Sequence, residues 1–310
     1  MSDISRRDAA APRFSAAEAP RAIVAICVGV AFLVLNDAIG KLLTERHDPA
    51  QIIFVRNLMA LPVIALLIWR LQGLVVLARA ALKVHAGRGF LQFCGGYMYF
   101  SSLQHLPLAE ATALVFSAPI FIAILSVPLL RERVGPWRWG AVLLGFGGVM
   151  IIVQPGGEAF QPAALLALGT AFFYALFMLG ARGIPRSEGI LSMMFYVNLF
   201  PMFFAAPVAA FVWVPVATGD LWLLAGMAVA GSIGLTLIAQ AFRMAPASVV
   251  APFDYTALIW AAALGWLIWG DLPASATVLG AAVIVASGVL IIWREGLQRQ
   301  RRRTGPPPPD

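Results

Sequence analysis

The sequence predicts an all-α polytopic membrane protein with ten transmembrane helices, arranged as two inverted five-helix repeats. The composition is the first observation, because 61% of the 310 residues are hydrophobic and 12% are charged. Soluble domains have about a quarter of their residues charged. The second observation is a series of ten apolar windows, and the third is that features of the first half recur in the second.

Each window is close to the length of about 20 apolar residues that a helix needs to span a bilayer. The windows are 22–43, 50–69, 87–104, 108–130, 135–154, 162–182, 190–214, 220–242, 247–269 and 275–293. The first is long and follows a polar leader, which is atypical of a cleaved signal peptide, so we expect a retained helix. The connections are short, so we expect consecutive helices to lie side by side and antiparallel.

The repeats are recognised by nearly constant offsets between matching residues. The segment 106–109 recurs as 245–248, and Glu132 recurs as Asp271. The further matches are Gly29, Ala31, Phe32 and Gly40 with Gly169, Ala171, Phe172 and Gly180, and Phe54, Asn57 and Leu58 with Phe195, Asn198 and Leu199. A unit with five spans must enter the membrane from opposite sides in its two copies, which is typical of alternating-access transporters.

These observations divide the chain into four parts. We expect residues 1–20 to form a disordered cytoplasmic tail, 21–155 the first repeat, 156–295 the second repeat, and 296–310 a basic, proline-rich disordered tail. Both tails have too few apolar groups to order themselves. Apolar residues at helical spacing over 71–83 predict a short interfacial helix between the second and third spans.

The basic residues indicate the orientation. With ten spans and the N-terminus inside, the inner segments hold 19 of the 22 Lys and Arg residues. The positive-inside rule then places both termini in the cytoplasm. Because topology accounts for the net charge of +7, we expect no nucleic-acid partner.

Catalytic and metal-binding patterns are absent from the sequence. The three histidines, His47, His85 and His105, fall in connections, and no spacing suits a metal site or a nucleophile elbow. Cys27 and Cys94 lie in apolar windows, where they behave as small hydrophobes. We therefore expect no enzyme activity, no catalytic residue, no metal and no cofactor.

Ionisable groups within the first two windows are candidates for a binding site. Asp37 and Lys41 are four residues apart on one helix face, Asn36 adjoins them, and Arg56 lies about two turns into the second window. Intramembrane charges are costly and are paired or face water. These groups either form an ion pair, Asp37 with Lys41 or Arg56, that joins two helices, or contact substrate; the sequence leaves both open.

Asp254 is the sharper candidate, because it lies next to a helix-loosening proline. Pro252 removes a backbone hydrogen-bond donor beside Asp254 and Tyr255 in the ninth window. Pro119 predicts a similar kink in the fourth window, and the repeat makes these two helices partners near the pseudo-two-fold axis. Asp254 either binds substrate or a proton, or is a core acid satisfied by a neighbouring Ser, Tyr or Arg243.

Polar and aromatic residues of other windows could line the same cavity or simply pack. Tyr97, Tyr99 and Trp260 are the candidates that we assign to the substrate site. Gln92, Gln104, Tyr174, Tyr196, Asn198 and Gln240 are further candidates. Tryptophans near span ends are typical of an aromatic belt at the membrane interface.

Several motifs resemble the EamA-type branch of the drug/metabolite transporter superfamily. They are Leu106–Ala113, Glu132–Gly135, Gly145–Val149 with Gln154–Gly156, and Ala245–Ser248 continuing to Tyr255. The resemblance covers about residues 22–295 and implies ten helices around a central cavity in a bacterial inner membrane. Asn36, Asp37 and Lys41, with the Ala-Pro and Tyr of the ninth helix, look most like the S-adenosylmethionine uptake carriers. Riboflavin importers and amino-acid or metallophore exporters remain alternatives, and Val115 stands where the first repeat would match Asp254.

The leading hypothesis is a secondary active transporter of a small polar metabolite. No ATP-binding motif is present, so we expect coupling to a proton, another ion or an exchanged substrate. The expected partners are this substrate and membrane lipid, and a homodimer is left open. The alternative from another class is a receptor or scaffold that keeps the bundle without transporting.

Overall fold

The computed structural model describes residues 19–71, 73, 75, 77, 80–130, 135–157, 160–185 and 188–304. Within these ranges every regular element is a helix and no strand occurs. Residues 1–18 of the expected N-terminal tail, Glu132 and much of the expected interfacial helix over 71–83 lie outside them. The fold class predicted from composition and apolar windows is confirmed.

The helices follow the ten predicted windows in order. They are α1 (Ala19–Leu43), α2 (Pro49–Leu71), α3 (Leu82–Leu103), α4 (Leu108–Val115), α5 (Ala118–Leu130), α6 (Pro136–Val153), α7 (Ala163–Gly180), η2 (Ala181–Gly183), α8 (Ile190–Phe211), α9 (Thr218–Met244), α10 (Ala247–Val250), η3 (Ala251–Thr256), α11 (Ala257–Trp269) and α12 (Ser275–Thr304). Among the described residues, seven helical stretches are long and apolar enough to cross a membrane. Two shorter apolar helices, Trp139–Val153 and Ser275–Ile291, correspond to the fifth and tenth windows. The last helix continues to Thr304, so residues 296–304, which we expected to be disordered, are helical.

The fourth and ninth windows are each interrupted, as their prolines predict. The fourth is split at Phe116 and Ser117 into α4 and α5, and Pro119 stands in the first turn of α5. In the ninth, a 3₁₀ turn that contains Pro252 separates α10 from α11. A proline cannot donate to the helix ladder, which favours such breaks. The interruptions lie on helices that pack together, since α4 contacts α11.

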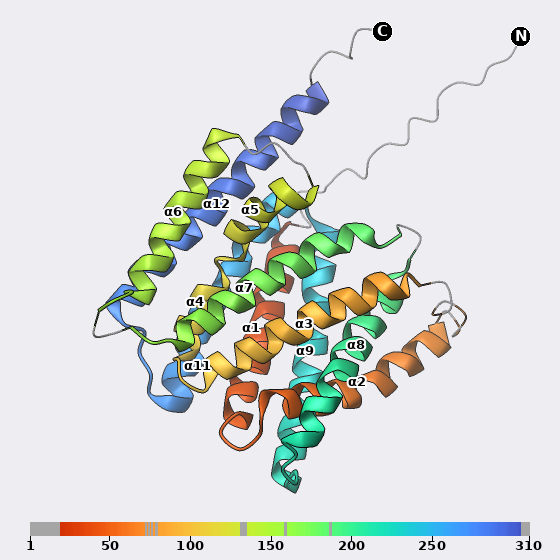
Figure 1. The fold of residues 1–310 in the computed structure, drawn as a ribbon. Helices are drawn as coiled ribbons and strands as arrows, with labels where there is room; N and C mark the ends of the chain where they lie inside the picture. Colours follow the sequence, from red (N-terminus) through yellow and green to blue (C-terminus); the bar gives the residue numbers. More distant parts are fainter. Residues whose placement is uncertain are drawn as a thin grey trace, which may run out of the picture.

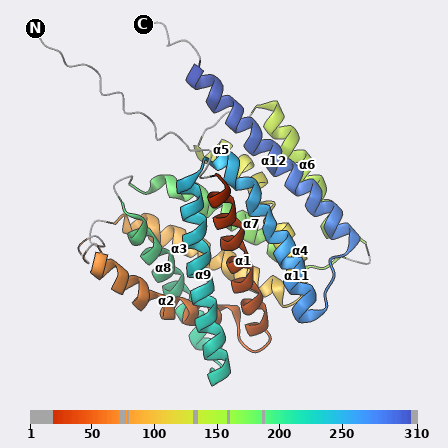
Figure 2. The ribbon, with the colours of Figure 1, turned by 180° about the vertical axis from the view of Figure 1, so that it is seen from behind.

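Helices pack across the two halves in a symmetric pattern, which Figures 1 and 2 show from opposite sides. The first span packs along the eighth (α1 with α9), and the equivalent sixth packs along the third (α7 with α3). Equivalent helices also meet one another: α2 with α8, α4 with α11, and α6 with α12. This pattern is that of two five-helix repeats related by a pseudo-two-fold axis.

Glycines allow the closest of these crossings. A Cβ added at Gly29 of α1 would lie 2.9 Å from the carbonyl oxygen of Gly234 on α9, and one at Gly234 would lie 2.8 Å from that of Gly29. Gly148 and Gly280 make the same kind of approach between α6 and α12. Small residues allow such backbone contact in lipid, where helix association depends on close packing.

Candidate functional site

The Asp37 cluster surrounds an acid in the C-terminal half of α1. The amide of Asn36 donates to Asp37 Oδ1 over 2.9 Å, and the phenol of Tyr99 on α3 donates to Asp37 Oδ2 over 3.1 Å. Asn36 is buried, and its Oδ1 would lie 3.2 Å from a Cβ added at Gly231 of α9. Each oxygen of Asp37 therefore has a donor, and helices from both repeats fix its position.

Arg56 contributes to this cluster without a direct ion pair. Its guanidinium interacts electrostatically with Asp37, but no contact within 4.0 Å joins them among the described residues. The guanidinium carbon lies 5.9 Å from the centre of the Phe100 ring. Neither of the predicted ion pairs of Asp37 forms, since Arg56 stays at a longer range and Lys41 turns to another acid.

Asp254 forms the second acidic position, and its environment differs. It stands in the 3₁₀ turn of the ninth span, partly exposed, with no hydrogen bond or ion pair to any described residue. Tyr174 of α7 and the adjacent Tyr255 are close enough to interact with its charge. The alternative in which a Ser, a Tyr or Arg243 satisfies this acid is not what the structure shows, and Arg243 is exposed.

Helix α4 links the two acidic positions. Tyr99 of the Asp37 cluster lies beside Thr112, and the ring of Phe116 lies 5.0 Å from the ring of Tyr255, between centroids. Thr112 and Phe116 are four residues apart, so they share one helix face about 6 Å apart along the axis. The two acids therefore lie near the same short stretch of α4, where the fourth and ninth spans meet.

Lys41 points away from Asp37 and lies in the last turn of α1. Its Nζ donates to the carbonyl oxygen of Leu106 over 2.9 Å, lies 3.7 Å from Asp271 Oδ2 and 4.8 Å from the centre of the Trp269 ring. Asp271 was recognised in the sequence only as a repeated residue, and not as the partner of Lys41. Lys41 thus joins the ends of three elements.

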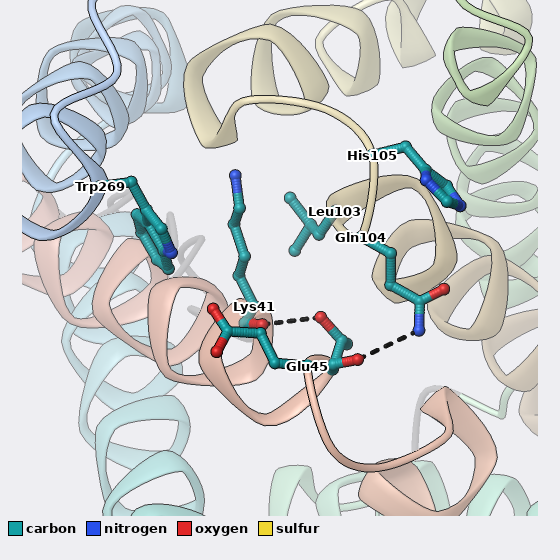
Figure 3. Close-up of a pocket in the computed structure, with 7 residues that line it drawn as sticks. Lys41, Glu45, Leu103, Gln104, His105 and Trp269 are labelled. Carbon is teal, nitrogen blue, oxygen red and sulfur yellow. Dashed lines mark hydrogen bonds between the residues drawn. The ribbon is translucent and has the colours of Figure 1, made fainter.

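A cavity of about 340 Å³ opens beside Lys41. Figure 3 shows Lys41 extending between Trp269 and Leu103, with Glu45 and Gln104 nearby. Its lining residues are Lys41, Thr44, Glu45, Leu103, Gln104, His105 and Trp269. The cavity carries both a cationic and an anionic side chain, Lys41 and Glu45.

The remaining predicted residues do not join either acid. Tyr97 lies 6.0 Å from Phe93, between ring centroids, and interacts with the charge of Asp48 at the start of α2. Trp260 is 40% exposed and makes no ring contact within the described part of the chain. Of the nine predicted site residues, the structure therefore brings together Asn36, Asp37, Arg56 and Tyr99 as one cluster, and Asp254 with Tyr255 as another.

Two histidines that we assigned simply to connections are in fact buried partners of acids. His47 Nε2 lies 3.0 Å from Asp220 Oδ2, and His85 Nε2 lies 2.7 Å from Glu188 Oε1. Their partners are more than 100 residues away in the chain, so local spacing could not reveal them. No cluster of three or more metal-ligating residues occurs in the described part of the chain.

Comparison with known proteins agrees with this architecture. The profile of the EamA-like transporter family matches residues 20–154 and 161–293, one match in each half. A multi-pass helical bundle with duplicated halves is a class typical of membrane transporters. The chain belongs to the EamA-like transporter family.

Relatives with several substrates are similar to this chain. The S-adenosylmethionine uptake transporter of Rickettsia bellii is 30% identical over 264 residues, covering 84% of this chain and 89% of the relative. The riboflavin transporter of Vibrio cholerae is 35% identical over 221 residues, covering 71% and 74%. The pseudopaline exporter of Pseudomonas aeruginosa is 27% identical over 271 residues, covering 87% and 94%.

A solved crystal structure supports the fold alone. It superimposes with a TM-score of 0.57 at 19% identity and covers 88% of this chain and 98% of the other. The family names point to transporters and not to enzymes, as the absence of catalytic motifs predicts. The substrate differs from relative to relative, so it has to be argued from the site.

Proposed function

We propose that this protein is a secondary active transporter that moves a small polar metabolite across the bacterial inner membrane by alternating access, with both termini in the cytoplasm. The single observation that carries the proposal is Asp254, an acid without a hydrogen-bond or ion-pair partner among the described residues, in the interrupted ninth span. An ionisable group within a span is costly to insert into the membrane, so such groups are rare and usually serve a function. Interrupted helices near the pseudo-axis are typical of transporter substrate sites.

The charges around the site favour a cationic or zwitterionic substrate. Asp37 and Asp254 contribute two carboxylates near α4, and Arg56 is the cation that interacts with Asp37. Asp254 has no such cation among its described neighbours. An S-adenosylmethionine-like compound, which carries a sulfonium and an amino-acid group, or another amino-acid derivative would compensate this excess of negative charge. A proton on Asp254 would do the same while the site is empty, which suits proton coupling.

Riboflavin import is the second candidate, and a different observation favours it. Phe116, Tyr255 and Tyr174 give the neighbourhood of Asp254 several aromatic faces. Planar ring systems stack on such faces. A flavin would use these rings, whereas Asp254 would accept hydrogen bonds from its ribityl hydroxyls and would not need to be charged.

Uptake into proteoliposomes tests these proposals. Labelled S-adenosylmethionine, riboflavin and an amino-acid panel should be offered to the wild type, to Asp254→Asn and to empty vesicles. We expect saturable uptake of a cationic or zwitterionic compound that Asp254→Asn abolishes. Riboflavin uptake that Asp254→Asn leaves intact would favour the second candidate. No saturable flux of any compound in either direction would favour a receptor or scaffold.

A further inference from the structure

Two buried histidine–carboxylate pairs lie in equivalent places of the two repeats. His47 follows α1 and bonds Asp220 at the start of α9, while Glu188 precedes α8 and bonds His85 near the start of α3. Glu188 follows His47 by 141 residues, the offset that also relates Phe54 to Phe195. The pseudo-symmetry therefore maps one pair onto the other with histidine and acid exchanged.

The two pairs share their burial and their bonding. Side-chain exposure is 3% and 6% for His47 and Asp220, and 1% and 4% for His85 and Glu188. Because a carboxylate only accepts, Nε2 carries the proton in each pair. Nδ1 of both rings is buried without a hydrogen-bond partner in the described part of the chain. The bond to the acid is thus the polar interaction that holds each ring.

A second donor holds each acid. Arg46 Nη1 lies 3.3 Å from Asp220 Oδ1, and Ser192 Oγ donates to Glu188 Oε1 over 2.9 Å. The ring of His85 also stacks on Tyr196, with centroids 4.9 Å apart. Removing one partner of such a buried pair leaves the other uncompensated, which is strongly destabilising. Each pair is therefore expected to resist separation.

Each pair joins helices that belong to different repeats. His47, between the first two spans, bonds Asp220 of the eighth, and Glu188, between the sixth and seventh spans, bonds His85 of the third. The same helices already pack closely: Gly29 meets Gly234 between α1 and α9, and Thr170 of α7 donates to the carbonyl of Gly95 on α3 over 3.1 Å. Each pair adds a polar bond between helices that are also in contact at a glycine.

We infer that each pair is a positioning fastener, a bond that holds one rigid body of the transporter together. Each body contains helices of both repeats: the first consists of α3 to α8, and the second of α1, α2 and α9 to α12. The first is called the middle body and the second the end body. The extensive α1–α9 and α3–α7 packing then lies within bodies. The packing of α2 with α8, α4 with α11 and α6 with α12 lies between them. A two-fold axis requires its interface to contain such contacts between equivalent elements.

The candidate substrate site lies on the boundary between these bodies. The bond from Tyr99 to Asp37 and the Phe116–Tyr255 ring contact both join the middle body to the end body. The cavity beside Lys41 crosses the same boundary, where Gln104 Nε2 donates to the carbonyl of Thr44 over 3.2 Å (Figure 3). Rocking along this boundary would open the site to one face at a time, while both fasteners stay closed. This inference rests on the proposed transport function.

Reversible cross-links distinguish a contact within a body, which stays closed during transport, from a contact between the bodies, which transport must break. His47→Cys with Asp220→Cys places two thiols within the end body, and Thr44→Cys with Gln104→Cys places two across the boundary at the same end of the bundle. A bis-methanethiosulfonate reagent, whose cross-link is cleaved by reduction, can join thiols that are too far apart for a direct disulfide. Cross-linking should leave uptake by the first protein within about twofold of its reduced form, but lower uptake by the second at least about tenfold, with recovery on reduction. Loss of uptake when positions 47 and 220 are cross-linked, or unchanged uptake when positions 44 and 104 are cross-linked, would overturn the inference.

A second measurement does not depend on transport. Single and double substitutions, His47→Gln with Asp220→Asn and His85→Gln with Glu188→Gln, give two double-mutant cycles of Tm in detergent. We expect the losses to be non-additive within each pair and additive between pairs. Additive losses within a pair would refute the fastener. If neither the wild type nor any reduced variant shows uptake, the proposed transport function is refuted. The double-mutant cycles would then still show whether the two members of each pair stabilise each other.

Discussion

Asp37 and Asp254 are both acids within membrane-spanning helices beside α4, but they differ in how they are bonded. Asp37 accepts hydrogen bonds from Asn36 and Tyr99 on its two oxygens. Asp254 accepts none from any described residue and lies in a 3₁₀ turn. The difference shows that depth in the bundle alone does not identify a binding group: a fully bonded acid can hold helices together, whereas an unbonded one is free to bind a ligand or proton.

The largest expected effect is that of Asp254→Asn. The amide keeps the size of the side chain but cannot carry a negative charge or titrate, so uptake should fall at least about tenfold and lose its pH dependence. The Tm in detergent should be unchanged or higher, because no bond to a described residue is lost and a partly buried charge is removed. Near-normal, still pH-dependent uptake would remove Asp254 from the mechanism and leave Asp37 as the next candidate.

Asp37→Asn should differ from Asp254→Asn by lowering the Tm as well as uptake. An asparagine at this position offers one acceptor and one donor group, so one of the two present donors loses its acceptor. A buried donor left without a partner costs about 1–3 kcal/mol, and we expect a lower Tm together with reduced uptake. Equal Tm values for Asp37→Asn and wild type would contradict the structural assignment of this acid.

Tyr99→Phe sharpens the comparison, because it removes a single donor from Asp37 and keeps the ring. Loss of one hydrogen bond should lower the free energy of unfolding by about 1 kcal/mol, less than Asp37→Asn. Uptake should remain measurable, with a changed pH dependence if Asp37 becomes free to titrate. Tyr97→Phe on the same helix is the comparison, because its phenol interacts with Asp48 and not with Asp37, so we expect the pH dependence of uptake to stay that of wild type.

Gly288→Ala tests the surroundings of Asp254 without altering an ionisable group. A Cβ at Gly288 of α12 would overlap the hydroxyl of Tyr255, so the phenol must move. Overpacking of this kind typically costs about 1–3 kcal/mol, and uptake should fall by a factor of a few. Gly147→Ala is the control, because a Cβ there meets nothing within 4 Å. Equal uptake by the two variants would show that the position of Tyr255 is unimportant.

The smallest effect is expected from Asp271→Asn, which alters the partner of the cavity residue Lys41. Lys41 and Asp271 are 3.7 Å apart, and the Asp271 side chain is 39% exposed. Exposed ion pairs contribute about 0–1 kcal/mol, and Lys41 keeps its bond to the Leu106 carbonyl. We expect Tm and maximal uptake to change little. A loss of uptake as large as that of Asp254→Asn would place the functional site at the cavity beside Lys41.

Local sequence signals predicted the helices and their interruptions well. Runs of about 20 apolar residues mark spans because the bilayer requires them, and Pro119 and Pro252 mark breaks because proline cannot donate to the helix ladder. The contact between the fourth and ninth spans followed from the repeat. These features depend on residues close together in the chain or on a regular offset.

The bonding of individual side chains could not be predicted in the same way. Asp37 has Lys41 four residues away on its own helix, yet it is bonded by Tyr99, and Lys41 reaches Asp271. Such choices depend on rotation and tilt of helices that are distant in the chain. The 141-residue offset from His47 to Glu188 was a readable signal, but histidine and acid do not resemble each other, so the match was missed.

The crossing of α1 with α9 has a consequence for biogenesis. Gly29 meets Gly234, which the ribosome adds 205 residues later. At about 5–20 residues per second, the first helix waits on the order of 10–40 s in the bilayer before its partner is synthesised. Asp37 lacks its phenol donor until Tyr99 has been synthesised, and Asn36 lacks its neighbour Gly231 for most of this interval. We therefore expect the first helix to stay in contact with the translocon or with other helices of the chain until α9 is synthesised.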